Sequence, residues 1–271
     1  MLCVCSCINL KPVNDFSGTS LKSIQNYENL DYSFTKQCLE KCNLDRLSEA
    51  TILRADSVKC DCADYKKADK ATGMLYQVVV GYFDNLQKIS NNEVSTYKFD
   101  ALKKALTEGK FGDVEIKKTQ VESYSKIAQI VSRAATDGYR KGKVKQFIAD
   151  ANEPIQDLVK SFQKILTENL KEELNFRKND YYLQYGVILK DKSLTNNERS
   201  VVVKEYYQKI TEIESKQKQI ENFADGLSKI SEGHQELYDN RDKLTAKEFQ
   251  DLIMSSTTDV KSIISEFKKL K

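Results

Sequence analysis

The fold of this chain is decided by the stretch from Pro154 to Asn240, which reads PIQDLVKSFQKILTENLKEELNFRKNDYYLQYGVILKDKSLTNNERSVVVKEYYQKITEIESKQKQIENFADGLSKISEGHQELYDN. Its second half carries apolar and small polar residues at steps that alternate between four and three. These positions are Tyr206, Ile210, Ile213, Gln217, Ile220, Ala224, Leu227, Ser231 and His234. An average step of about 3.5 residues is the repeat of a coiled-coil seam. The pattern therefore predicts a long helix that packs along one face.

The first half of the stretch carries a matching set of apolar residues. They are Ile155, Leu158, Phe162, Ile165, Leu166, Leu170, Leu174, Tyr181, Tyr185 and Ile188. Only the polar segment Asp191–Asn197 separates the two halves, and so short a connection leaves two helices antiparallel and in contact. We therefore predict an all-α fold, an elongated helical bundle with a long antiparallel coiled-coil hairpin. Asn152 and Pro154 predict the start of its first helix, and a capping box at Thr195–Glu198 predicts the start of its second.

The composition favours helix and narrows the class of protein. The 271 residues include only two prolines and ten glycines, and Lys and Arg exceed Asp and Glu by 43 to 40. A nucleic-acid-binding protein would carry a concentrated basic face, so we expect no nucleic-acid partner. The most apolar run, Met74–Phe83, is shorter than the roughly 20 residues of a membrane-spanning helix. We expect it to be buried in the core.

Four cysteines near the N-terminus have C-x3-C and C-x-C spacing. They are Cys38, Cys42, Cys60 and Cys62. The first two lie on one face of a predicted helix, and a reversal of the chain then favours two nested disulfides, Cys38 with Cys62 and Cys42 with Cys60. Residues two apart in a helix point about 200° apart, so Cys60 and Cys62 must lie in extended backbone or just before the next helix. A zinc site, for which the usual C-x2-C knuckles are absent, and free buried thiols remain as alternatives.

The chain divides into three predicted parts. Residues 1–16 form a tether, residues 17–112 form a helical part with the four cysteines, and residues 113–271 form the hairpin and a terminal helix. The glycine-containing segment Glu108–Asp113 marks the boundary between the second and third parts. A capping box at Thr245–Glu248 predicts the start of the terminal helix, which we expect to fold back on the hairpin.

The N-terminal sequence Val4-Cys5-Ser6-Cys7 resembles the lipobox of bacterial lipoproteins. An aliphatic residue stands three positions before Cys7 and a small residue stands one before it, so the resemblance implies lipidation of Cys7. The basic and apolar regions of a signal peptide are largely missing before Val4, so this interpretation expects the true start to lie upstream. The alternatives are a tail with incidental thiols and a clustered S-palmitoylation site.

The chain lacks the residues that common catalytic sites require. Its one histidine is His234, whereas di-iron bundles need two Glu-x-x-His motifs and zincin proteases need two histidines. No phosphate-binding glycine loop is present either. We therefore predict no catalytic residue, no cofactor and no metal site. We expect His234 to lie in the seam with a hydrogen-bond partner, or at its solvent edge.

Tyrosines gather near the predicted hairpin turn. Tyr181, Tyr182 and Tyr185 precede it, and Tyr206 and Tyr207 follow it. Tyrosine combines apolar area with a polar end and is enriched at protein interfaces. These five residues are the candidate contact with a protein partner, and packing between the two helices is the alternative.

Three functions are consistent with this sequence. We favour a non-enzymatic binding or scaffold protein of the bacterial cell envelope, anchored to a membrane by lipid and facing the periplasm or the cell surface. Disulfides and the lipobox resemblance both imply such an oxidising compartment. The second hypothesis is a pore-forming or membrane-remodelling protein that exposes Met74–Phe83. The third is a cytosolic coiled-coil adaptor with reduced thiols.

Overall fold

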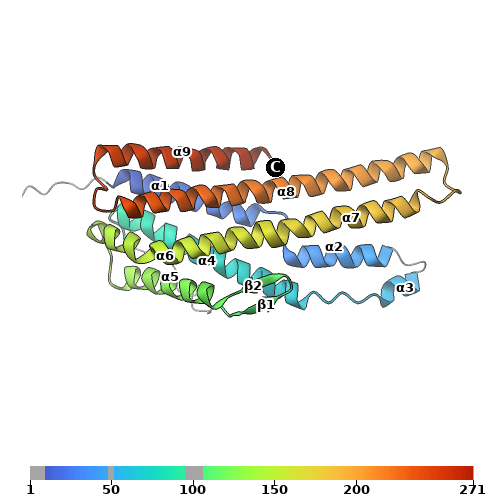
Figure 1. Ribbon diagram of the computed structural model, residues 1–271, viewed down its shortest axis with the longest axis horizontal. Helices are drawn as coiled ribbons and strands as arrows, with labels where there is room; N and C mark the ends of the chain where they lie inside the picture. Colours follow the sequence, from blue (N-terminus) through green and yellow to red (C-terminus); the bar gives the residue numbers. More distant parts are fainter. Residues whose placement is uncertain (1–9, 48–51, 95–105, 271) are drawn as a thin grey trace, which may run out of the picture.

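A computed structural model describes residues 10–47, 52–94 and 106–270, and the predicted all-α fold is confirmed. The helices form an elongated bundle (Figure 1). In chain order the elements are α1 (Lys11–Ile24), a 3₁₀ turn (Gln25–Asn29), α2 (Phe34–Leu47), α3 (Ile52–Ser57), α4 (Ala63–Ser90), β1 (Gly109–Phe111), β2 (Val114–Ile116), α5 (Lys118–Thr136), a 3₁₀ turn (Lys141–Lys143), α6 (Val144–Lys164), a π-helical turn (Ile165–Leu170), α7 (Lys171–Ile188), α8 (Asn196–Asp239) and α9 (Lys247–Lys269).

The long hairpin is present as predicted. α6, the π-helical turn and α7 run on as one segment, and α8 returns antiparallel to it (Figure 1). The capping box at the start of α8 is also confirmed, because the Glu198 amide donates to Thr195 Oγ1 at 3.3 Å and the Thr195 amide donates to Glu198 Oε2 at 2.8 Å. With 44 residues, α8 is roughly 65 Å long.

The predicted start of the first hairpin helix is wrong. The helix begins at Val144, and Pro154 lies inside it. A proline there removes one backbone hydrogen bond and costs about 3 kcal/mol. The residues before it offset this cost, since Phe147, Ile148 and Ala151 are fully buried on the face that continues into the hairpin.

The terminal helix folds back on α8 as expected, but its predicted capping box is wrong. Ala246 is the N-cap residue of α9, and no side chain caps it. The backbone amide of Ala246 instead donates to the Lys243 carbonyl at 2.8 Å. The turn after α8 therefore runs one residue further than the Thr245–Glu248 pattern predicted.

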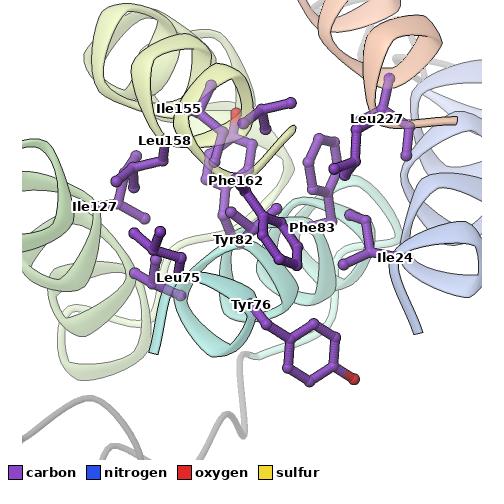
Figure 2. Close-up of a cluster of buried hydrophobic side chains, with 14 of the residues drawn as sticks. Ile24, Leu75, Tyr76, Tyr82, Phe83, Ile127, Ile155, Leu158, Phe162 and Leu227 are labelled. Carbon is purple, nitrogen blue, oxygen red and sulfur yellow. The ribbon is translucent and has the colours of Figure 1, made fainter. Parts of the chain in front are cut away.

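The helix α4 lies at the centre of the core. Leu75, Tyr82 and Phe83 are enclosed by side chains of α1, α5, α6 and α8 (Figure 2). The apolar run Met74–Phe83 is thus largely buried, as predicted, and Gln77 is its exposed position. In the described part of the chain, no helix combines the length and the apolar composition that spanning a bilayer requires.

The predicted tether is wrong for the residues that the structure describes. Helix α1 begins at Lys11, and Leu10, Val13 and Phe16 are buried in the core. Their spacing of three residues places them on one side of the helix, so this short segment has enough apolar surface to dock. Residues 1–9, which include Cys7, lie outside the described residues.

Both predicted disulfides are present. Cys38 bonds Cys62 and Cys42 bonds Cys60, with Cα–Cα distances of 5.8 and 5.6 Å. Cys60 and Cys62 lie in irregular backbone just before α4, as the pairing requires, and the zinc and free-thiol alternatives do not apply. A second link fixes the start of α2, because the Asp69 carboxylate of α4 accepts from the amides of Phe34 and Thr35, both at 2.9 Å.

The glycine-containing segment forms a small antiparallel hairpin of β1 and β2. Gly109 pairs with Ile116, and Gly112 takes a positive φ of 57° in the turn. Val114 and Ile116 are buried in the same hydrophobic cluster as residues of α1, α4 and α6. The core is therefore continuous across the position at which the sequence suggested a boundary.

The close packing of α1, α8 and α9 can be tested by a substitution at Gly233 of α8. A Cβ atom there would lie 2.5 Å from Cε2 of Phe16, whereas no heavy atom lies within 4 Å of a Cβ at Gly186. We expect Gly233→Ala to lower the free energy of unfolding by about 1–3 kcal/mol through overpacking. The matched Gly186→Ala is expected to raise it by up to about 1 kcal/mol through helix propensity. Chemical denaturation followed by circular dichroism measures both, and equal effects would contradict the close packing.

Candidate functional site

The five candidate tyrosines divide into two groups in the structure. Tyr181, Tyr185 and Tyr206 lie in the seam between α7 and α8, with ring centroids 6.1 Å apart for the first pair and 5.8 Å for the second. Burial raises the pKa of Tyr181 and of Tyr185. Packing between the helices therefore accounts for these three residues.

Tyr182 and Tyr207 instead point to solvent. Their exposed fractions are 67% and 63%. Tyr207 contacts the seam through Tyr206, with ring centroids 5.2 Å apart. Of the five tyrosines predicted to contact a partner, these two are the ones that the structure leaves widely exposed.

A second apolar stripe on α7 was missed by the sequence analysis. Phe176, Leu183 and Val187 are 61%, 65% and 67% exposed. They follow the spacing i, i+7, i+11 and stand two residues after the seam positions Leu174, Tyr181 and Tyr185, which turns them to the side of the helix away from α8. The same spacing rule that found the seam could have found this stripe.

The exposed stripe borders a groove between α7 and α2. The groove has a volume of about 470 Å³ and is lined by Leu44, Asp45, Asp180, Leu183, Gln184, Val187 and Ile188. We call the stripe of Phe176, Leu183 and Val187 together with this groove the distal surface. It lies near the hairpin turn, at the end of the bundle opposite to the start of α1 (Figure 1).

The walls of this groove are positioned by contacts of α2 with α4 and of α7 with α2. The disulfides and Asp69 hold α2 against the start of α4. Below the groove, Arg177 of α7 is 1% exposed and donates from Nη2 to the Gln37 carbonyl of α2 at 3.1 Å. A buried guanidinium requires partners to offset its desolvation, so this contact fixes α7 relative to α2.

The single histidine is in the core and not at a surface. His234 is 1% exposed and lies between Tyr82, whose Oη is 2.5 Å from Nε2, and Asn152, whose Oδ1 is 3.0 Å from Nδ1. Since the amide oxygen of Asn152 accepts, Nδ1 carries the proton and Nε2 accepts from the Tyr82 hydroxyl. The expected seam position with a hydrogen-bond partner is confirmed. Burial lowers the pKa of His234 to about 3.

In the chain's described ranges, no group of three or more His, Cys, Asp and Glu side chains is arranged to hold a metal ion. The features that stand out are therefore the distal surface and the polar contacts beneath it. The groove of the distal surface combines the apolar side chains of Leu183 and Val187 with the carboxylates of Asp45 and Asp180.

Comparison with known proteins finds no matching family model, no similar curated protein and no similar solved structure.

His234 gives a testable dependence of stability on pH. Its folded pKa of about 3 lies below the ordinary value of 6.5, so the unfolded chain binds an extra proton in that window and stability falls as the pH falls. The slope approaches about 1.4 kcal/mol per pH unit. We expect His234→Gln to remove this contribution, so that the difference in unfolding free energy between wild type and variant shrinks from pH 7 to pH 4.5.

Chemical denaturation at several pH values measures this difference. Side-chain ¹⁵N NMR of the wild type provides a second readout if the variant folds poorly, and it should show neutral imidazole down to about pH 4. A His234 that titrates near pH 6.5 would contradict the buried neutral state.

Proposed function

We propose that this protein is a non-enzymatic binding protein of the bacterial cell envelope. Lipid on Cys7 holds it to a membrane, and the distal surface contacts a protein partner. The observation that carries the proposal is the position of the exposed apolar stripe Phe176, Leu183 and Val187, far along the bundle from the start of α1 at Lys11.

The compartment is supported by the two disulfides. Cys38–Cys62 and Cys42–Cys60 indicate an oxidising environment outside the cytosol, because cytosolic thiols are kept reduced. They disfavour the cytosolic adaptor that the sequence left open.

The geometry supports attachment at one end and binding at the other. Helix α1 starts at the end of the bundle opposite to the α7–α8 turn (Figure 1), and Cys7 precedes Lys11 by only four residues in the sequence. A lipid there would leave the hairpin turn pointing away from the bilayer by roughly the length of α8, about 65 Å. The distal surface would then be accessible to a partner.

The distal surface has the composition of a protein interface. The core of a protein interface is more apolar than the rest of the surface and is surrounded by a polar rim, and single exposed apolar residues elsewhere on a protein are ordinary. Here Leu183 and Val187 adjoin Asp45 and Asp180 in one groove. A pore former would instead have to expose Met74–Phe83, and the burial of that run in the core does not favour such a function.

The anchor is tested on protein isolated from the cells that make it. Mass spectrometry of the N-terminal peptide is expected to show Cys7 as the first residue, carrying a diacylglyceryl group. Cys7→Ser is expected to move the protein from the membrane fraction to the soluble fraction, and Cys5→Ser is the matched control that should stay with the membrane. Unmodified Cys7, or membrane retention of Cys7→Ser, would refute the anchor.

The binding surface is tested by photo-crosslinking in the same cells. A photoreactive residue in place of Leu183 is expected to give one discrete adduct with a partner protein. Met254, which is 57% exposed on α9, is the matched control and is expected to give none. The same adduct from both positions, or none from Leu183, would show that the distal surface is not the contact.

A further inference from the structure

The arm of the hairpin beyond Leu170 contacts α2 through a polar cluster, of which Gln37, Glu173 and Arg177 are buried. Gln37 of α2 donates from Nε2 to Oε2 of Glu173, and Arg177 donates to the Gln37 carbonyl at 3.1 Å and to Asp180 Oδ2 at 3.1 Å. Glu173 also shares a hydrogen bond with Asp113 of the β1–β2 turn. We call Gln37, Asp113, Glu173, Arg177 and Asp180 the Glu173 cluster.

The protonation state of Glu173 sets the net charge of this cluster. Its surroundings hold two cations, Arg177 and Lys41, and two other carboxylates, Asp113 and Asp180. Taken together with Lys41, the cluster has a net charge of zero when Glu173 is protonated and of −1 when it is not. Burial, followed by the hydrogen bond with Asp113 and its charge, raises the pKa of Glu173 to about 7.

Two tyrosines that face Glu173 stay neutral near neutral pH. Tyr65 of α4 and Tyr32 before α2 have pKa values that burial raises above the ordinary value of 10. A separate ion pair, Lys216 with Glu40 at 3.3 Å, links α8 to α2. Among the groups of this contact whose pKa is shifted, Glu173 is the one whose pKa lies between pH 6 and pH 8.

The hydrogen bonding of the contact is incomplete even when Glu173 is protonated. Gln37 Oε1, Arg177 Nε and Tyr32 Oη are buried and have no hydrogen-bond partner among the described residues. Each buried polar group without a partner costs about 1–3 kcal/mol. The negative charge of deprotonated Glu173 therefore further destabilises a contact that these unpaired groups already weaken. Water solvates the unpaired groups when the contact opens.

The two sides of the contact differ in how firmly they are held. The start of α2 is fixed by Asp69, and its middle is fixed by the disulfides at Cys38 and Cys42. On the other side, α7 begins directly after the π-helical turn Ile165–Leu170, a geometry in which regular helix hydrogen bonding is interrupted. Movement at this contact is thus a movement of the hairpin arm away from a fixed α2.

We propose that the Glu173 cluster is a pH-sensitive contact, which holds α2 against the hairpin arm while Glu173 is protonated and opens when Glu173 loses its proton. Opening widens the groove between Leu44 of α2 and Leu183 of α7. The proposal concerns the fold alone and stands whether or not the distal surface binds a partner.

Hydrogen exchange at pH 6 and pH 8, corrected for the intrinsic exchange rate, tests the contact. In the closed state the pKa of Glu173 is about 7 and in the open state it returns to about 4.5. Linkage then raises the opening equilibrium about tenfold between the two pH values. We expect peptides covering residues 171–188 to lose about tenfold in protection, and peptides from α4 to lose none.

Two variants decide the cause of this change. Glu173→Gln keeps a neutral amide and is expected to remove the pH dependence, whereas Glu172→Gln, the exposed neighbour on the same helix, is expected to keep it. If Glu173→Gln does not fold, Asp113→Asn serves instead, because loss of the Asp113 charge lowers the pKa of Glu173 and moves the change to lower pH. Equal protection at pH 6 and pH 8 in the wild type, an unchanged dependence in Glu173→Gln, or an unshifted one in Asp113→Asn would overturn the proposal.

Discussion

The enclosure of α4 is the constraint on which the rest of the structure depends. Tyr82 and Phe83 are fully buried, and the helix has apolar side chains on most of its circumference. A helix of that kind is stable only when other helices cover it. α1, α5, α6 and α8 do so, and each can therefore keep one polar face toward solvent. The single histidine is satisfied in this layer because α4 supplies Tyr82 and α6 supplies Asn152.

Periodicity and local chemistry predicted the long elements well. The 3.5-residue repeat gave the hairpin, the Thr195–Glu198 pattern gave the start of α8, and the C-x3-C and C-x-C spacing gave both disulfides. Each of these signals is a spacing of a few residues along the chain. The errors arose where contacts between residues far apart in the sequence determine the local structure. Burial of Phe16 against α8 and α4 makes a helix of a segment that looked like a tether, and burial of Phe147 keeps Pro154 inside a helix.

The candidate surface was predicted only in part for a related reason. The five tyrosines were grouped as one contact because they are close in the sequence, although Tyr181 and Tyr185 stand at seam positions of the repeat and Tyr182 does not. The distinction depends on the rotation of α7, which seats Tyr185 against Tyr206 and turns Leu183 outward. The Glu173 cluster could not be predicted at all, since Gln37, Asp113 and Arg177 are far apart in the chain and meet only after α2 docks. The disulfides link α2 to the rest of the fold covalently, and this cluster links it through charged groups.

The seam with α8 limits how the length of α7 can vary after the π-helical turn at Ile165–Leu170. An α-helix rotates by about 100° for each residue, so the deletion of one residue from α7 between Lys171 and Tyr185 would rotate the rest of that helix relative to α8. Tyr185 would leave the seam, and Val187 would turn toward α8. Insertions or deletions of three or four residues restore most of the rotation. Length changes in this segment are therefore compatible with the fold in whole turns, whereas the loop before Thr195 can accept them singly.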